Sequence, residues 1–150
     1  TYIAYDDEIE AIRRPRSLVE KREEFDAFWG ELVGNEQQAQ KLIENYYSRV
    51  EEANRFFTSQ KEGWKTDRGM IYIVLGPPIE VNHYVDTEVW RYGYGGRAPE
   101  NTFVFERGHN YDGRGPLFNN YILQRRASYR NAWRRAVQEW RDGSAPRGGA

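Results

Sequence analysis

The chain has 150 residues and a formal net charge of −1 at pH 7, so it has no overall field that would attract nucleic acid or an anionic membrane. It contains no cysteine, which excludes disulfides and thiolate chemistry, and no apolar stretch approaches the ~18 residues needed to span a bilayer. Aromatic residues make up 15% of a sequence whose apolar fraction is only 39%, so we expect an aromatic-rich core.

The N-terminal half has the patterns of helices. Acids followed by bases predict a short helix over residues 5–14. Ser17 begins a capping box, and apolar residues then recur at helical spacing as far as Gly34. Asn35 can cap the next helix, whose apolar stripe continues to Phe57. We expect the two long helices to pack as an antiparallel hairpin across the short turn between them.

The second half has the patterns of strands. The continuous apolar and β-branched run at 70–75 predicts a buried strand. Alternating segments at 87–94 and 101–107 predict an antiparallel hairpin, and 118–124 predicts a fourth strand. Ser128 can cap a last helix that is basic with interleaved aromatic residues. Its aromatic residues share one stripe, so we interpret it as an amphipathic docking helix rather than a nucleic-acid contact.

Helices followed by strands predict an α+β fold, with an N-terminal helical hairpin packed on an antiparallel sheet of about four strands and a C-terminal helix. We expect one domain over residues 1–143, in which 1–16 form an N-terminal extension or short helix, and a disordered tail over 144–150. Because the sequence begins with Thr rather than Met, we interpret it as a mature chain or an excised domain.

The most distinctive segment is EGWKTDRGMIYIVLGPP at residues 62–78. Its residues 63–67 match the signature after which the GWxTD domain family is named, and the resemblance covers roughly residues 18 to 143. Further matching positions are Phe28, Trp29, Asn35, Glu36, Tyr46, Tyr47, Arg49, Val50, Ala53, Asn54, Arg68, Gly69, Glu88, Trp90, Tyr92, Phe103, Phe105, Tyr129, Trp133, Ala136, Val137, Trp140 and Arg141. The family comprises mostly exported or envelope-linked bacterial proteins. The resemblance therefore implies a periplasmic or outer-membrane-associated setting, and it brings no known reaction.

The chain departs from the family between the two long helices, where a Pro-rich insert is replaced by Gly30 to Gly34 alone. A weaker, fold-level likeness links the order of elements to the small BamE/SmpA-type lipoproteins of outer-membrane assembly. In those proteins two helices pack on a three-stranded antiparallel sheet and the module binds other proteins. The first resemblance implies a cell-envelope setting, and the second, which is a likeness of fold alone, is to modules that bind other proteins.

Two interpretations of the motif differ in the role of Asp67. In the catalytic interpretation, Asp67 is a base or ligand while Thr66 and Arg68 orient a substrate. In the structural interpretation, Thr66 or Asp67 accepts backbone N–H groups and Arg68 or Arg91 meets a carboxylate such as Glu88. We favour the structural interpretation because a loop before a buried element must satisfy its own backbone groups.

The structural interpretation also places the indole of Trp64 in the junction between helix and sheet. We therefore predict that Trp64, Trp90 and Phe103 are buried together. The candidate structural or binding residues of the motif and the later strand are Gly63, Trp64, Thr66, Asp67, Arg68, Glu88, Trp90 and Arg91.

Other catalytic and metal chemistries have little support in the sequence. The two histidines, His83 and His109, do not form a paired metal-ligand spacing, so we expect no metal and no cofactor. No serine lies in a Gly-x-Ser-x-Gly elbow, and the LGPP segment lacks the glycine-rich run and lysine of a phosphate loop.

Loops rich in Tyr, Arg, Asn and Gly have the composition of recognition surfaces. The candidate recognition residues are Tyr92, Tyr94, Arg97, Tyr111 and Arg114. The sequence thus favours a non-enzymatic interaction module that binds another envelope protein or another domain of its own chain, without nucleic acid or membrane insertion. One alternative is a glycan- or peptidoglycan-binding module that uses the tyrosines, and another is a hydrolase that uses Asp67 with His83.

Overall fold

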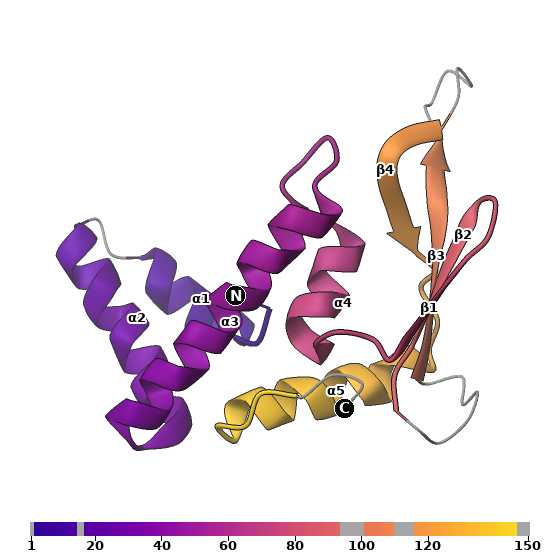
Figure 1. The fold of residues 1–150 in the computed structure, drawn as a ribbon. Helices are drawn as coiled ribbons and strands as arrows, with labels where there is room; N and C mark the ends of the chain where they lie inside the picture. Colours follow the sequence, from indigo (N-terminus) through magenta and orange to yellow (C-terminus); the bar gives the residue numbers. More distant parts are fainter. Residues whose placement is uncertain (1, 15–16, 94–100, 110–115, 147–150) are drawn as a thin grey trace.

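The computed structural model describes residues 2–14, 17–93, 101–109 and 116–146. Figure 1 shows the sheet on one side of the molecule, α4 between α3 and the sheet, and α5 crossing beneath α3 and α4. The elements in chain order are α1 (Asp6–Arg13), α2 (Leu18–Val33), α3 (Glu36–Phe57), the 3₁₀ helix η1 (Gly63–Lys65), α4 (Asp67–Leu75), β1 (Glu80–His83), β2 (Thr87–Arg91), β3 (Thr102–His109), β4 (Pro116–Leu123) and α5 (Tyr129–Arg141). The α+β class predicted from the sequence is confirmed.

The three N-terminal helices follow their predicted signals. Ser17 accepts a hydrogen bond from the backbone N–H of Glu20 at 3.1 Å, which starts α2. Gly34 ends that helix with a φ of 56°, a conformation that glycine adopts without strain. Asn35 then caps α3 by accepting from the N–H of Gln37 at 2.9 Å. The predicted helical hairpin is confirmed.

The prediction of a strand at 70–75 is wrong, because these residues belong to helix α4. Thr66 is the N-cap of this helix, and Gly76, with a φ of 88°, ends it. Its middle is buried on several sides, since Ile71 is 1% exposed and Ile73 and Val74 are 0% exposed. A helix enclosed in this way has an unbroken apolar sequence, which resembles that of a buried strand.

The sheet has four antiparallel strands in the order β1-β2-β3-β4. The hairpin of β2 and β3 was predicted, and β4 corresponds to the strand predicted at 118–124. Trp90 of β2 is paired with Phe103 of β3, and both side chains are buried toward α4 and α5 together with Phe105. The edge strand β1 was not predicted, because its four residues lack an apolar alternation.

Both ends of the described chain pack on the core. Of the two alternatives for residues 1–16, the structure shows the short helix, α1, and the preceding Ile3 is 0% exposed. Arg141 of α5 forms an ion pair with Glu8 of α1 at 2.7 Å, which joins the two ends. Within the tail predicted to be disordered, the N–H of Ser144 bonds to Glu139 O at 2.9 Å and Arg49 donates to the carbonyl of Pro146. That prediction is therefore wrong for residues 144–146, and residues 147–150 lie outside the described ones.

The last helix carries the predicted stripe. Trp140 is fully buried and its indole N–H donates to Val74 O at 2.8 Å, which fixes α5 against α4. Ser128 occupies the N-cap position, but its side chain makes no capping bond. Across the described residues, every helix is too short or too polar to cross a membrane.

Candidate functional site

The motif is built on two glycines that allow three helices to meet at backbone contact. A Cβ on Gly63 would lie 1.9 Å from the carbonyl oxygen of Ala53 in α3. A Cβ on Gly69 would lie 2.0 Å from the carbonyl oxygen of Gly63. Neither position has room for a side chain, so η1 is held between α3 and α4 by its own backbone.

Thr66 closes this junction with one hydroxyl group. Its Oγ1 donates to Gly63 O at 2.7 Å and accepts from the N–H of Gly69 at 3.0 Å. From α3, Asn54 accepts from the N–H of Trp64 at 3.0 Å. The backbone of the turn is therefore satisfied by side chains, as the structural interpretation predicts.

Asp67 ties the start of α4 to the sheet. One carboxylate oxygen accepts from the N–H of Leu123, at the end of β4, at 2.8 Å. The other oxygen lies 3.5 Å from Nη2 of Arg125. As the first residue of α4, Asp67 also places its negative charge where the helix dipole favours it. All these contacts are structural, and they confirm that Asp67 accepts a backbone N–H.

Arg68 of α4 is buried, and its side chain connects the helix to strands β2 and β4. It donates through Nη1 to Oε2 of Glu88 at 3.2 Å and through Nη2 to Asn119 O at 2.7 Å. Its guanidinium lies 5.2 Å from the ring centroid of Phe57 and 4.4 Å from that of Tyr121, so it is sandwiched by aromatic faces. Burial lowers the pKa of Arg68, and the charge of Glu88 opposes that shift.

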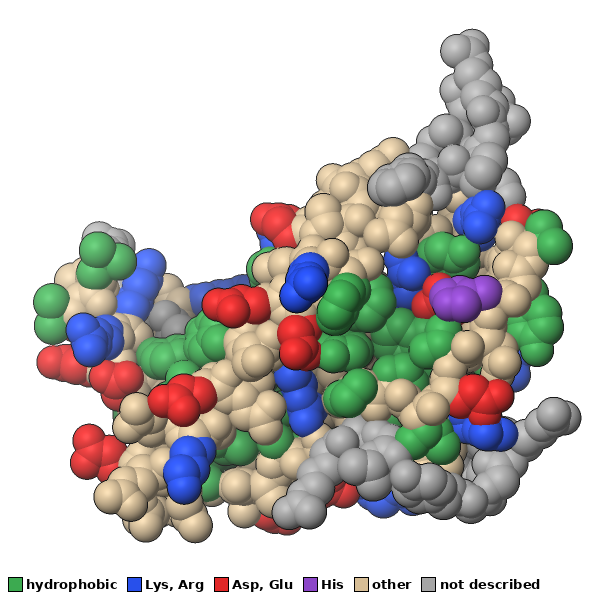
Figure 2. Space-filling view, in the orientation of Figure 1, with side chains coloured by type: hydrophobic (Ala, Val, Ile, Leu, Met, Phe, Trp, Pro, Cys, Tyr) green, Lys and Arg blue, Asp and Glu red, His purple; other side chains and the backbone are tan. Residues whose placement is uncertain are grey.

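The carboxylate of Glu88 contacts three side chains. Besides Arg68, the indole N–H of Trp90 donates to its carboxylate, and Nδ1 of His83 lies 3.2 Å from Oε2. Glu88 is 3% exposed, whereas the side chain of His83 is 70% exposed. Figure 2 shows a histidine side chain, in purple, at the surface beside acidic and hydrophobic side chains. A buried carboxylate thus orients an exposed imidazole.

The hydrolase alternative required Asp67 and His83 to act together. Among the described residues, the carboxylate of Asp67 contacts the backbone N–H of Leu123 and the side chain of Arg125, whereas His83 contacts Glu88. Arg91, the other arginine considered for Glu88, pairs with Glu80 on the neighbouring strand. The two residues of the hypothetical catalytic pair are therefore bound to different partners.

The prediction that Trp64 is buried with Trp90 and Phe103 is wrong for Trp64. Trp90 is 2% exposed and Phe103 is 0% exposed, but Trp64 is 38% exposed. Its ring lies 6.4 Å from the ring of Tyr2 and 5.2 Å from Nζ of Lys65. The close backbone approach at Gly63 leaves no room for the indole within the junction, so the side chain lies at the surface.

The predicted recognition residues have different outcomes. Tyr92 is 6% exposed and donates from its hydroxyl to Gly76 O at 2.9 Å, so its assignment to a recognition surface is wrong. Burial raises the pKa of Tyr92 well above its ordinary value. The other four residues of that set, Tyr94, Arg97, Tyr111 and Arg114, lie outside the described residues. The glycan-binding alternative therefore loses the one of its tyrosines that the structure describes.

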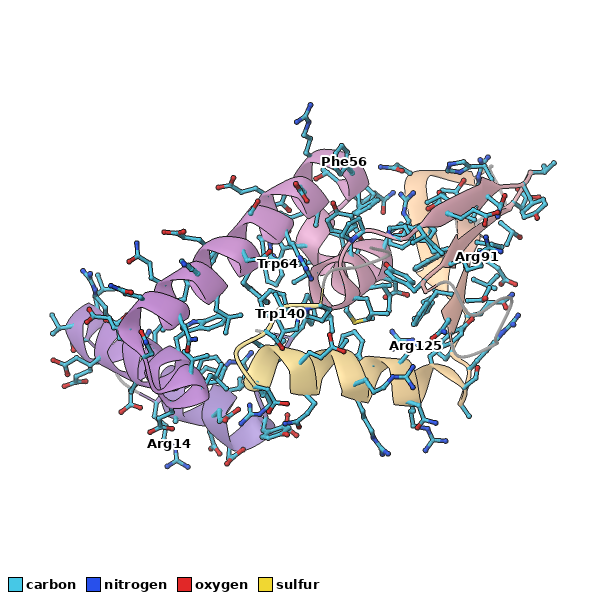
Figure 3. The ribbon with its side chains drawn as sticks, turned by 60° about the horizontal axis from the view of Figure 1, so that its bottom comes forward. Arg14, Phe56, Trp64, Arg91, Arg125 and Trp140 are labelled. Atoms are coloured by element: carbon cyan, nitrogen blue, oxygen red, sulfur yellow. The ribbon has the colours of Figure 1, made fainter. Side chains whose placement is uncertain are left out.

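Two adjoining pockets lie along α5, and we call them the α5 pockets. The larger has a volume of about 570 Å³ and the smaller about 410 Å³, and Trp133 lines both. Figure 3 shows Arg125 of the larger pocket close to the start of α5. The larger pocket is lined by Met70, Ile71, Phe103, Leu123, Arg125, Arg126, Ala127, Tyr129, Arg130 and Trp133. The smaller is lined by Tyr2, Ala4, Tyr5, Trp133, Arg134, Val137 and Gln138.

Sequence reasoning predicted a docking helix here but did not place these pockets. Their walls come from the N-terminal segment, α4, the ends of β3 and β4, and α5, so no local pattern could assemble them. Arg49 was missed as a structural residue as well. It is 7% exposed, donates to Ile73 O at 3.0 Å and lies 5.0 Å from the ring centroid of Trp140. The mixture of arginines and aromatics on the last helix was the available signal for the pockets.

The sequence matches the family model described as the GWxTD domain over residues 1–142. The chain belongs to the GWxTD domain family. The match includes residues 1–17, which precede the resemblance seen in the sequence, and Ile3 among them is buried in the GWxTD core. No curated protein and no solved structure matches this GWxTD chain.

Proposed function

We propose that this GWxTD domain is a non-enzymatic interaction module that binds another protein or another domain of its own chain in the bacterial cell envelope. The α5 pockets carry this proposal, because they combine apolar walls with arginine, tryptophan and tyrosine side chains. These residue types are enriched at the centres of protein interfaces.

The polar side chains of the motif already make contacts within the protein, which supports binding over catalysis. Thr66, Asp67 and Arg68 each use their polar atoms on backbone groups or on a buried partner. A catalytic group needs an acceptor or donor that faces the substrate, and these atoms are already engaged inside the protein. The setting in the envelope rests on the family resemblance alone and is part of the proposal.

The test is capture from an envelope extract by the immobilised folded domain, with quantification of the retained proteins. Any further domain of the full-length polypeptide, expressed separately, forms a second arm. We expect saturable retention of a small set of proteins, or of the chain's own domains, at micromolar concentration. Domain unfolded in urea before immobilisation is the control and should retain none of them selectively.

His83→Ala separates binding from a reaction that would use the exposed imidazole. Its side chain is 70% exposed, so the variant should fold and retain the same proteins. Equal retention by folded and unfolded domain, together with a turnover that His83→Ala abolishes, would contradict the proposal.

A further inference from the structure

The larger α5 pocket has an unbalanced charge. Its described lining includes three arginines and no acidic residue, although the whole chain carries a net charge of −1. Arg125 is partly neutralised by Asp67 at 3.5 Å, and Arg126 donates to the neutral amide oxygen of Gln124. Among the described residues, Arg130 has no acidic partner within ion-pair distance. At least two exposed cations thus border an apolar cavity without a counter-charge of their own.

The apolar part of this pocket suits a side chain from a partner. Ile71, Phe103 and Leu123 form buried walls, whereas Met70 and Trp133 are half-buried and line the open space. A volume of about 570 Å³ is within the range of sites that enclose a ligand group. Methionine adapts its shape to the group it meets, and tryptophan supplies rigid contact area.

The second pocket indicates a chain rather than a single small molecule. Trp133 lines both cavities, and Val137 of the smaller pocket follows it one turn later on the same face of α5. Arg130 and Arg134 repeat this one-turn spacing, about 6 Å along the helix. Consecutive pockets beside a row of cations match a peptide whose apolar anchors alternate with acidic side chains.

We infer that the α5 pockets bind an acidic, apolar segment of a partner protein, with one apolar side chain between Met70 and Trp133 and carboxylates on Arg126 and Arg130. This inference rests on the proposed function and names the surface and the class of sequence that it uses. Burial of the apolar anchor supplies affinity, and the arginines select acidic neighbours over basic ones.

The test starts from selection of random twelve-residue peptides on the folded domain. We expect the enriched peptides to combine Asp or Glu with Leu, Ile, Phe or Trp. The chain has one methionine, so a ¹³C-methyl label on Met70, after removal of any initiator Met, gives one signal from the pocket wall. An enriched peptide should shift that signal saturably.

Charge reversal provides the matched variants. Arg126→Glu combined with Arg130→Glu should weaken binding of the enriched peptide at least about tenfold, because two attractive contacts become repulsive. Arg135→Glu, on an exposed position of α5 that lines neither pocket, should change binding less than about twofold. Replacing the acids of the peptide by their amides should weaken its binding to the wild type and abolish the difference between the variants.

Three results would overturn the inference. The first is enrichment of neutral or basic peptides, and the second is a Met70 signal that does not shift when an enriched peptide binds. The third is occupation of the pocket by sodium laurate at concentrations at which no peptide binds. In each case the proposed function stands if the domain still retains envelope proteins. If neither peptides nor envelope proteins bind the folded domain, the proposed function fails as well.

Discussion

Arg68 of α4 donates to Glu88 of β2 at 3.2 Å, and both side chains are buried in the interior of the protein. This pair connects the motif to the sheet through the core, where the side chains are only 6% and 5% exposed. Removing charged groups from water is costly, so each partner depends on the other. We therefore expect the loss of either partner to destabilise the fold.

Breaking this pair should be strongly destabilising. We expect Arg68→Met to lower the free energy of unfolding by about 3–5 kcal/mol, because it leaves the Glu88 carboxylate buried without its cation. Adding Glu88→Gln to that variant should recover part of the loss, so that the double-mutant cycle gives a coupling energy well above zero. Urea unfolding of the four proteins measures it. Additive effects of the two substitutions would show that the pair is not a unit.

The glycines of the motif allow a sharper comparison. Gly63→Ala should destabilise the domain by more than about 3 kcal/mol or prevent folding, because its Cβ would lie 1.9 Å from a backbone oxygen of α3. The control is Gly30→Ala in α2, where nothing lies within 4 Å of the new Cβ. That change should stabilise the helix by about 0.5–1 kcal/mol. Thermal unfolding compares both, and similar melting temperatures for the two variants would refute the tight junction.

The two tryptophans Trp64 and Trp90 should respond differently to truncation. Trp90→Ala removes a ring that is 2% exposed and should cost about 3–5 kcal/mol. Trp64→Ala should cost only about 1–2 kcal/mol, because its ring is 38% exposed and already partly in contact with water. Urea unfolding monitored by circular dichroism gives both values. Equal losses would mean that Trp64 is buried in solution.

The sequence predicted those features whose causes are local. The capping residues Ser17 and Asn35 and the apolar stripes of α3 and α5 determine their helices over a few neighbouring positions. The partners of the motif were also anticipated, because the first residues of a buried element need acceptors, and a buried Arg68 needs a carboxylate.

The wrong predictions have one physical cause in common, which is packing against elements that are distant in the sequence. The apolar run at 70–75 is a helix because Thr66 caps it and other elements cover it on several sides. The spacing of the apolar residues in such a covered helix does not distinguish it from a buried strand. The interpretation of the motif as the junction between helix and sheet predicts a buried Trp64, but the backbone contact at Gly63 excludes its ring. The α5 pockets depend on segments that are distant in sequence, so they became visible only with the fold.

Stability should fall at alkaline pH. Burial raises the pKa of Tyr46 to about 12, compared with about 10 in an unfolded chain. The folded protein therefore keeps the phenol neutral where the unfolded chain ionises, so the stabilisation is complete below pH 10 and is lost between pH 10 and about 12. Urea unfolding at pH 8, 9, 10 and 11 measures the decline. Tyr46→Phe should make it shallower, and an unchanged slope would exclude Tyr46 as its source.

The structural role of the motif is tested most directly by measuring partner retention and urea unfolding on one variant, Asp67→Asn. We expect its free energy of unfolding to fall by about 1–2 kcal/mol, because a neutral amide replaces the charged acceptor of the Leu123 N–H. Asp26→Asn on the exposed face of α2 is the control and should change stability by less than about 0.5 kcal/mol. The folded Asp67→Asn domain should retain its envelope partners as the wild type does. Undiminished stability combined with loss of binding, or with loss of a measurable turnover, would contradict a structural role for Asp67.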